Sequence, residues 1–488
     1  MPELNRRKFV GALALTGFTV DAVANNAAEA ADDASPGASA QGAKNVTRTL
    51  ARYVLNAQPA DAPEAVRKEA RRTLLNWLGC AVGGSRHETV DNAIAAMAPF
   101  AGAKQSAVYG RKERLDVMTA ALVNGISSHI FDFDDTHLRT IIHPAGPVAS
   151  AILALAEYHP VSGRDFLNAL VLGVEVECRI GNAVYPAHYD AGWHITGSAG
   201  VFGAAAAAGK LLRLNEQQML WALGIAAVQP VGLREMFGTM TKSFHAGRAA
   251  QNGLTAAMLA SRNFTSSEQG IEARYGWANV LSTTRNYAEI TENLGKTYEV
   301  SINTYKPFAC GIVVHPSIDG AIRLRNKYKI TPDQVERVDL KVHRLVFELT
   351  GNKEPQNGLG GKFSVYHAVA AALVEGAAGE AQFSDRTVRD ATVVALRRRV
   401  TATLDPSVVE DQAHVSITLK DGRTLDEFVE HAVGSVKNPM SDRDLENKFQ
   451  ALAQGVLPAA QTRRLIDLLW RVEELGNAAD IAKAAAAA

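Results

Sequence analysis

Apolar residues in the first half of the chain recur at the spacing of amphipathic helices. From Val66 to Leu78 they stand every four positions, after Pro63 marks a helix start. The same spacing predicts helices over residues 64–82, 117–130, 148–158, 163–184, 196–212, 216–227 and 246–261. Because the alternation typical of strands is scarce here, we expect a large all-helical domain over residues 45–300.

The pattern changes near residue 300. Residues 335–345 alternate between apolar and polar positions as a strand does. Strand-like runs on both sides of Asp421-Gly422 predict a hairpin closed by a type I′ turn. Helices are expected between these strands, over residues 316–327, 364–375 and 384–394. We therefore expect a smaller α+β domain over residues 301–436.

The helical pattern returns at Ser441 and continues through Leu445, Phe449 and Leu452. We expect residues 437–488 to form C-terminal helices that pack back on the all-helical domain. The whole chain is therefore predicted to be mainly α, with one large helical domain and one smaller α+β domain.

Composition narrows the classes of function. The chain has 488 residues, of which 47% are hydrophobic and 21% charged, and its formal net charge is zero. With no basic excess, nucleic acid and anionic membrane surfaces are not expected as partners. The three cysteines, Cys80, Cys178 and Cys310, lie far apart and match neither a zinc-ligand spacing nor a disulfide framework.

The first 44 residues differ from the rest. A basic start that contains Arg6-Arg7 precedes an apolar stretch over residues 11–20, and alanine-rich sequence follows. This arrangement resembles a twin-arginine export signal followed by a linker, which predicts a periplasmic protein. The apolar run is shorter than the roughly 20 residues that a membrane span needs, so no anchor is expected in the mature chain. The alternative is a disordered basic tail on a cytoplasmic protein.

The densest polar segment covers residues 131–146. Between Asp132 and His143 it contains three carboxylates, two hydroxyls and two imidazoles, and apolar helix-prone stretches flank it on both sides. Buried charges are costly unless they are paired or used, so the segment is a candidate site. Two alternatives stay open: at least one of Asp134 and Asp135 caps the next helix, or His137 and His143, with nearby carboxylates, bind a metal.

Three further segments concentrate reactive groups. His194 stands at the start of a helix rich in glycine and alanine, and Lys242, His245 and Arg248 lie in or just before the first turn of another. A third segment, residues 305–316 with Lys306, falls at the expected domain boundary, where pockets are common. Taken singly, His194 could be a core histidine and Lys242 part of a solvated face.

Together these segments offer cations that can hold carboxylates and imidazoles that can move protons. Abstraction of a proton next to a carboxylate needs both, because a base must act while fixed positive charge stabilises the enolate. The sequence contains no nucleophilic serine elbow, phosphate-binding loop or dinucleotide fingerprint that would indicate other chemistry.

Five motifs in order resemble the MmgE/PrpD family, which includes 2-methylcitrate dehydratase, cis-aconitate decarboxylase and iminodisuccinate epimerase. The resemblance covers about residues 45–475. The motifs are residues 132–137 with His143-Pro144, Trp193-His194, Lys242-Ser243-Phe244-His245-Ala246-Gly247, Lys306-Pro307-Phe308 and Gly361-Lys362-Phe363-Ser364-Val365-Tyr366. Such a set is specific for the family and weak for the individual member.

The resemblance implies a homodimer in which residues 301–436 form a lid over the helical domain, with a site between them and neither metal nor other cofactor. It implies two groups of site residues. We expect the catalytic ones to be His143, His194, Asp132 and Tyr366, and those that bind the substrate to be Thr136, Lys242, His245 and Lys306. Either His194 or His143 would transfer the proton.

We therefore expect a cofactor-independent lyase of a small di- or tricarboxylate, with dehydration as the reaction. Epimerisation, decarboxylation and binding without turnover are the alternatives. In the decarboxylase branch a histidine follows the lid-boundary lysine by five residues, and this chain has Gly311 there. That difference argues against the decarboxylase, and a scheme with a third imidazole would need His245 or His315.

Overall fold

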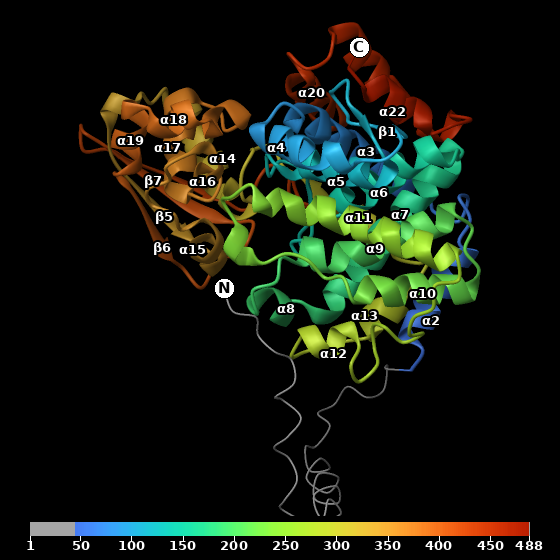
Figure 1. Cartoon of the computed structure of the whole chain (residues 1–488). Coiled ribbons are helices and arrows are strands. Elements are labelled where there is room, and N and C mark those ends of the chain that lie inside the picture. Colours follow the sequence, from blue (N-terminus) through green and yellow to red (C-terminus); the bar gives the residue numbers. More distant parts are fainter. Residues whose placement is uncertain (1–43, 488) are drawn as a thin grey trace, which may run out of the picture. The chain divides into compact units, whose positions relative to one another are not determined.

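The structure is a computed structural model that describes residues 44–487, so the predicted export signal lies outside the described residues. Helices carry most of the described chain, and its main sheet has four strands (Figure 1). The predicted fold class, mainly α with a smaller α+β part, is confirmed. Within residues 44–487, no helix combines the length and the hydropathy that crossing a membrane requires.

A small-residue helix, α9 (Ile195–Leu211), lies at the centre of the helical part. It packs on α7 (Gly163–Val184), α11 (Thr241–Ser261) and α6 (Ala145–Tyr158), and Figure 1 shows α9 and α11 side by side. A Cβ added at Gly253 of α11 would lie only 2.6 Å from the carbonyl oxygen of Val201. The glycines and alanines therefore let helix backbones approach closely, as the sequence predicts.

A second close approach joins α11 to α5 (Val117–His129). A Cβ at Gly125 would lie 2.5 Å from the Cα of Gly247. Helix α5 also packs on α3 (Glu64–Gly84), and it ends where the polar segment begins. These contacts fix the end of α5 relative to the start of α11.

The other helices follow the predicted spacing closely, with one exception. Residues 384–394 form two helices, α18 (Asp385–Arg389) and α19 (Ala391–Arg397), where one was predicted. The break falls at Asp390, whose carboxylate accepts hydrogen bonds from the backbone N–H groups of Thr392 and Val393. The remaining helices around the helical core are α2 (Val46–Asn56), α4 (Glu88–Met97), α8 (Ala187–Asp190), α10 (Glu216–Ala227), α12 (Trp277–Leu281) and α13 (Ala288–Thr291).

The four-stranded sheet has the order β6-β5-β7-β8. Strands β5 (Val335–Val342), β7 (Ala413–Leu419) and β8 (Thr424–Val429) were predicted and pair antiparallel in that order. Strand β6 (Val400–Leu404) was not predicted, and it lies parallel to β5 at the edge. Helices α14 (His315–Tyr328) and α17 (Val365–Glu375) pack against these strands, and α15 (Arg344–Thr350) and α16 (Gly358–Gly361) connect β5 to α17.

The turn between β7 and β8 differs from the predicted type I′ turn. Only Gly422 of the Asp421-Gly422 pair has a positive φ, 89°, whereas type I′ needs positive φ at both residues. The N–H of Gly422 donates to the carbonyl of Leu419, and Leu419 pairs with Arg423. The hairpin therefore has a three-residue loop that ends in a left-handed glycine.

The C-terminal helices return to the helical part. Helix α20 (Asp442–Ala453) packs on α3, where a Cβ at Gly79 would lie 2.9 Å from the ring of Phe449. Helices α21 (Ala459–Trp470) and α22 (Ala479–Ala485) follow. By their contacts the residues from Lys44 onward form one compact unit, so the domain boundaries after residues 300 and 436 stay predictions.

All three cysteines are buried and unpaired. Cys80 lies on α3, Cys178 on α7 and Cys310 just before α14. Burial raises the pKa of Cys80 to about 12, and it raises the pKa of Cys178 and Cys310 as well.

Candidate active site

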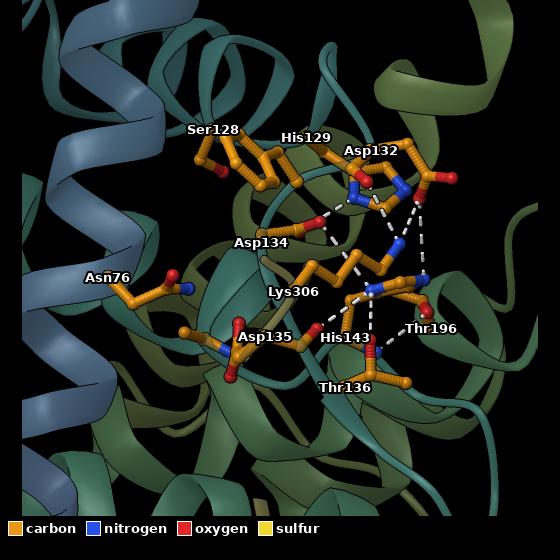
Figure 2. Close-up of polar contacts among 12 residues, drawn as sticks. Asn76, Ser128, His129, Asp132, Asp134, Asp135, Thr136, His143, Thr196 and Lys306 are labelled. Atoms are coloured by element: carbon orange, nitrogen blue, oxygen red, sulfur yellow. Dashed lines mark hydrogen bonds and ion pairs between the residues drawn. The ribbon is translucent and has the colours of Figure 1, made fainter. Parts of the chain in front are cut away.

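The polar segment forms a short ribbon with a distant part of the chain. Strand β3 (Asp135–His137) pairs antiparallel with β4 (Asn303–Tyr305), and Thr136 lies opposite Thr304. The ribbon brings Lys306, the residue after β4, next to Asp132, the third residue after α5 (Figure 2). The predicted boundary segment and the polar segment therefore meet.

Asp132 is held between two lysines. Its Oδ1 lies 3.0 Å from Nζ of Lys242 and 2.7 Å from Nζ of Lys306, and Lys306 also donates to the Asp132 carbonyl at 2.9 Å. All three residues are buried. Burial alone would raise the pKa of Asp132, but the two ammonium groups hold it well below its usual value. The aspartate is therefore ionised.

Three imidazoles surround this ion cluster. The ring centroids of His129 and His143 lie 4.7 Å apart, those of His129 and His194 5.7 Å, and those of His143 and His194 6.3 Å. Thr136 Oγ1 lies 3.4 Å from Nδ1 of His143. Six residues named from the sequence thus come together in one place: Asp132, Thr136, His143, His194, Lys242 and Lys306.

His129 is a member of this cluster that the sequence analysis missed. Its Nδ1 lies 2.7 Å from Oδ2 of Asp134, and its Nε2 accepts from Nζ of Lys242 at 2.9 Å. The only local signal is a histidine at the end of an apolar helix, three residues before Asp132. His129 supplies the third imidazole for which His245 and His315 had been considered.

Hydrogen bonds fix the tautomer of two of the histidines. Nδ1 of His143 lies 2.8 Å from the carbonyl oxygen of Asp135, which can only accept, so Nδ1 carries the proton. Because Lys242 donates to Nε2 of His129, the Nδ1 of that ring is likewise the donor, to Asp134. Burial lowers the pKa of both rings, most strongly for His143, so both are neutral with an unprotonated Nε2.

His194 is positioned by His245. Their Nδ1 atoms lie 2.9 Å apart, so one of them donates, and Phe237 packs edge-on against the His194 ring. Burial, Lys242 and His245 lower the pKa of His194 well below its usual value, and burial lowers that of His245 to about 3. The hydrogen bond places His245 next to His194, and its predicted role in substrate binding stays a prediction.

Two other candidate residues, Tyr366 and His315, make no hydrogen bond to the cluster within residues 44–487. Tyr366 is on α17, and among the described residues no hydrogen bond joins its hydroxyl to the cluster; Nζ of Lys353 lies 5.9 Å from its ring centre. Nε2 of His315 lies 3.3 Å from the carbonyl of Cys310, and its ring packs edge-on against Phe308. The predicted catalytic role of Tyr366 receives no support from these contacts.

The metal pair considered from the sequence does not form. His137 is bonded through Nδ1 to Thr140 and through Nε2 to Glu299, at 2.7 and 2.8 Å, and His143 contributes to neither bond. Potential ligand atoms of His129, His143 and His194 do lie within 4.8 Å of one another. A metal ion there would have to displace the ammonium of Lys242 from His129, so this set fits a cation poorly.

Behind the cluster lies a second group of carboxyls. Asp135 Oδ2 accepts from the N–H of Ala145 at the start of α6 and from Asn303, which confirms the capping role considered from the sequence. Burial and the charge of Asp134 raise the pKa of Asp135 to about 7. Burial also raises the pKa of Glu177 well above its usual value. Both groups are therefore readily protonated, in contrast to Asp132.

Comparison with known protein families agrees with the family resemblance of the sequence motifs. The MmgE/PrpD N-terminal domain matches residues 48–290 and the MmgE/PrpD C-terminal domain matches residues 308–473. The chain is 28% identical to a cis-aconitate decarboxylase of Aspergillus terreus, across 88% of this chain and 94% of that protein. It is 27% identical to the cis-aconitate decarboxylase of Mus musculus, across 88% and 91%. It is 22% identical to the 2-methylcitrate dehydratase of Salmonella typhimurium, across 82% and 88%. The chain belongs to the MmgE/PrpD family.

Proposed function

We propose that the protein is a cofactor-independent lyase of a small di- or tricarboxylate, which acts by proton transfer at the carbon next to a carboxylate. One observation carries the proposal: two buried ammonium groups and three imidazoles converge on a single carboxylate, Asp132. The names of the related proteins, a decarboxylase and a dehydratase, support an enzyme that acts on such acids.

The two lysines would hold the substrate. Lys242 donates to His129 and Asp132, and Lys306 donates twice to Asp132. An ammonium group has three N–H donors, so one on each lysine is left for a substrate carboxylate. These charge-assisted bonds would also stabilise the enolate that forms when the neighbouring carbon loses its proton.

The base would be a neutral imidazole, His143 or His194. The unprotonated Nε2 of His143 lies 3.9 Å from Oδ1 of Asp132, on the side where the lysines meet. Burial and the two lysines disfavour the protonated ring. A bound polycarboxylate adds negative charge beside it, which raises the pKa of the imidazole toward neutrality just when the proton must be taken.

Dehydration is the reaction that we propose first. After the proton is lost, hydroxide leaves the adjacent carbon and takes a proton from the imidazolium that the first step formed, which releases water and restores the neutral imidazole. Gly311 supports this choice, since the decarboxylase-type histidine has no counterpart there. Decarboxylation is the second candidate, because identity to the cis-aconitate decarboxylases, 27–28%, exceeds the 22% to the dehydratase.

A panel of di- and tricarboxylates in deuterated water tests the proposal. Deuterium exchange next to a carboxylate, together with an unsaturated product, is the expected result. Release of carbon dioxide would replace dehydration by decarboxylation, and exchange without elimination would indicate an epimerase. Tight binding without exchange would make the protein a binding protein, and neither binding nor exchange with any acid would refute the proposal.

A further inference from the structure

Lys448 brings a third ammonium group to the back of the cluster. It lies on α20, only 8% of the residue is exposed, and Nζ lies 3.8 Å from the ring centre of Phe133. Nζ donates to Oδ1 of Asn76 at 2.7 Å, to the carbonyl of Phe133 at 2.6 Å and to the carbonyl of Lys306 at 2.8 Å. Its three N–H donors are therefore all used within the protein, which leaves none for a substrate.

Two of these acceptors are backbone atoms of the candidate active site. Phe133 directly follows Asp132, and the other carbonyl belongs to Lys306 itself. The side chain of Lys306 in turn donates to the carbonyl and the carboxylate of Asp132. Lys448 and Lys306 together thus join α20, the segment after α5 and the segment after β4 in one closed set of hydrogen bonds.

This set holds a strained residue. Asp132 has a φ of 48°, in the left-handed region that residues other than glycine seldom adopt. Such a conformation persists only where its surroundings enforce it. Lys306 fixes the carbonyl of Asp132, and Lys448 fixes the next carbonyl, that of Phe133. Both peptide groups that follow the Asp132 Cα are therefore anchored by ammonium groups.

Burial of the charged Lys448 side chain costs free energy of folding. Burial and, to a lesser extent, the charge of Lys306 together lower the pKa of Lys448 to about 8, against the opposite effects of Cys80, Asp134 and Asp135. A lysine of this kind is destabilising unless its bonds are needed. A neutral methionine of similar length could fill the same space, so the three bonds account for the charge.

We propose that Lys448 is a positioning residue for the reaction: it holds the Asp132 backbone and the Lys306 backbone in the arrangement that aims their side chains at the substrate. The proposal rests on the proposed function for its kinetic test only. Lys448 itself touches neither the substrate nor the reacting atoms, since its donors are spent on Asn76, Phe133 and Lys306.

The test compares the variants Lys448→Met and Lys448→Arg in the full chain. With the substrate found in the acid panel, Lys448→Met is expected to lower kcat/KM about 100-fold, mostly through kcat, because small displacements of reacting groups are that costly. Lys448→Arg, which keeps a charged multiple donor, is expected to recover at least about 10-fold of this loss. A crystal structure of Lys448→Met should show Asp132 outside the left-handed region or Lys306 moved from its carboxylate.

A matched control is Lys68→Met. Lys68 also joins α3 to α20, through Asp442 at 2.9 Å, but its side chain is 52% exposed and lies outside the cluster. It should leave kcat and KM unchanged. The proposal is wrong if Lys448→Met keeps kcat/KM within about 3-fold of the wild type, if Lys448→Arg is no better than Lys448→Met, or if Asp132 and Lys306 stay in place in the crystal structure.

Two complications have their own answers. If the wild-type protein turns over no acid, the proposed function fails, and the crystal structure of the variant alone decides the role of Lys448. If Lys448→Met does not fold, Asn76→Ala replaces it, because it removes the side-chain acceptor that orients the Lys448 ammonium toward the two carbonyls and so weakens both carbonyl bonds. A fall of about 10-fold in kcat/KM then supports the proposal, and an unchanged value contradicts it.

Discussion

At the scale of single residues, the cluster separates carboxyl groups that carry charge from those that tend to be neutral. Asp132 stays ionised between Lys242 and Lys306, whereas Asp135, behind it, has a pKa raised to about 7. The imidazoles are neutral because burial disfavours their protonated form. Fixed cations in front of neutral bases are what proton abstraction from a polycarboxylate requires.

Replacement of His194 should remove turnover without unfolding the protein. His194→Ala is expected to lower kcat by about 100- to 10,000-fold, the contribution of a general acid or base. Turnover with the identified substrate, together with circular dichroism and thermal unfolding, is the measurement. His431→Ala, at a partly exposed hydrogen bond with Asp411, is the control. Near wild-type activity in His194→Ala would place the reaction elsewhere.

Chelation is expected to leave activity unchanged. Lys242 Nζ lies 2.9 Å from Nε2 of His129. Its positive charge repels a metal ion, and its hydrogen bond occupies the nitrogen lone pair that such an ion would need. The measurement is kcat before and after dialysis against a chelator. A loss that a divalent ion restores would assign the three imidazoles to a metal site.

Asp135 should make stability depend on pH. Its pKa in the folded protein, about 7, lies above the ordinary value of 3.8, so between about pH 4 and 7 the folded protein holds a proton that the unfolded chain has lost. This group's stabilising contribution is therefore present at low pH and is lost as the pH rises to 7. Relative to Asp135→Asn, the wild-type free energy of unfolding should fall across this range in urea titrations.

The control for this titration is Asp390→Asn, which changes an exposed helix cap of α19. Its difference from the wild type should not follow the same course between pH 4 and 7. Parallel curves for the wild type and Asp135→Asn would show that Asp135 titrates normally in the folded protein.

At the scale of elements, helix contacts set the distances within the site. Helix α5 ends in His129 and α11 begins next to Lys242, and the two helices approach most closely at Gly125 and Gly247. The hydrogen bond between His129 and Lys242 therefore depends on two glycines one or two turns away. The two helices that pack most closely here are therefore also the ones that position His129 and Lys242.

A methyl group at this approach should disturb both. Gly125→Ala places a Cβ 2.5 Å from the Cα of Gly247, where backbone has to move, and is expected to cost about 1–3 kcal/mol of stability. It should also lower kcat/KM, since His129 and Lys242 separate. Urea unfolding and steady-state kinetics are the measurements. Gly102→Ala, whose Cβ meets nothing closer than 3.9 Å, is the control, and equal behaviour of the two variants would contradict the argument.

Elements could be predicted from the sequence wherever their signals are local. The span of α7, Gly163–Val184, matches its prediction because apolar spacing and the Ser162 cap lie within the segment. Strand β6 could not be predicted in this way, since its partner β5 is about 60 residues earlier and the strand is short. The break at Asp390 was missed because a cap between two short helical segments looks, in the sequence, like one more polar position of a single helix.

The site residues divide along the same line. His143, His194, Lys242 and Lys306 stood in motifs of reactive groups, so the sequence indicated them. His129 and Lys448 lie outside those motifs, so the sequence did not indicate them. Their importance comes from partners 113 and 315 residues away, Lys242 and Phe133. Contacts of that range have no signature in the spacing of a single sequence.

At the scale of the whole molecule, the candidate site needs nearly the full length of the described chain. Its residues come from the end of α5, the starts of α9 and α11, the segment after β4, and α20. The C-terminal helices are therefore part of the site, through Lys448, as well as of the fold. Truncation before residue 448 would leave two site carbonyls without their donor.

Export belongs to this scale too. We expect the N-terminal segment to direct the folded protein to the periplasm, so replacing Arg6 and Arg7 by lysine should keep it in the cytoplasm. Cell fractionation with immunodetection is the measurement, and Lys8→Arg, which leaves the arginine pair intact, is the control. An unchanged periplasmic share in the double variant would show that the pair is not an export signal.

The three buried thiols have a practical consequence. Because the pKa of each is raised, the folded protein presents almost no thiolate, and alkylating reagents or oxidants can attack only after a local opening. Cys80 and Cys178 sit inside the helical core, whereas Cys310 stands four residues after Lys306. Residue-resolved labelling rates would therefore compare how often the helical core opens locally with how often the segment that follows Lys306 does.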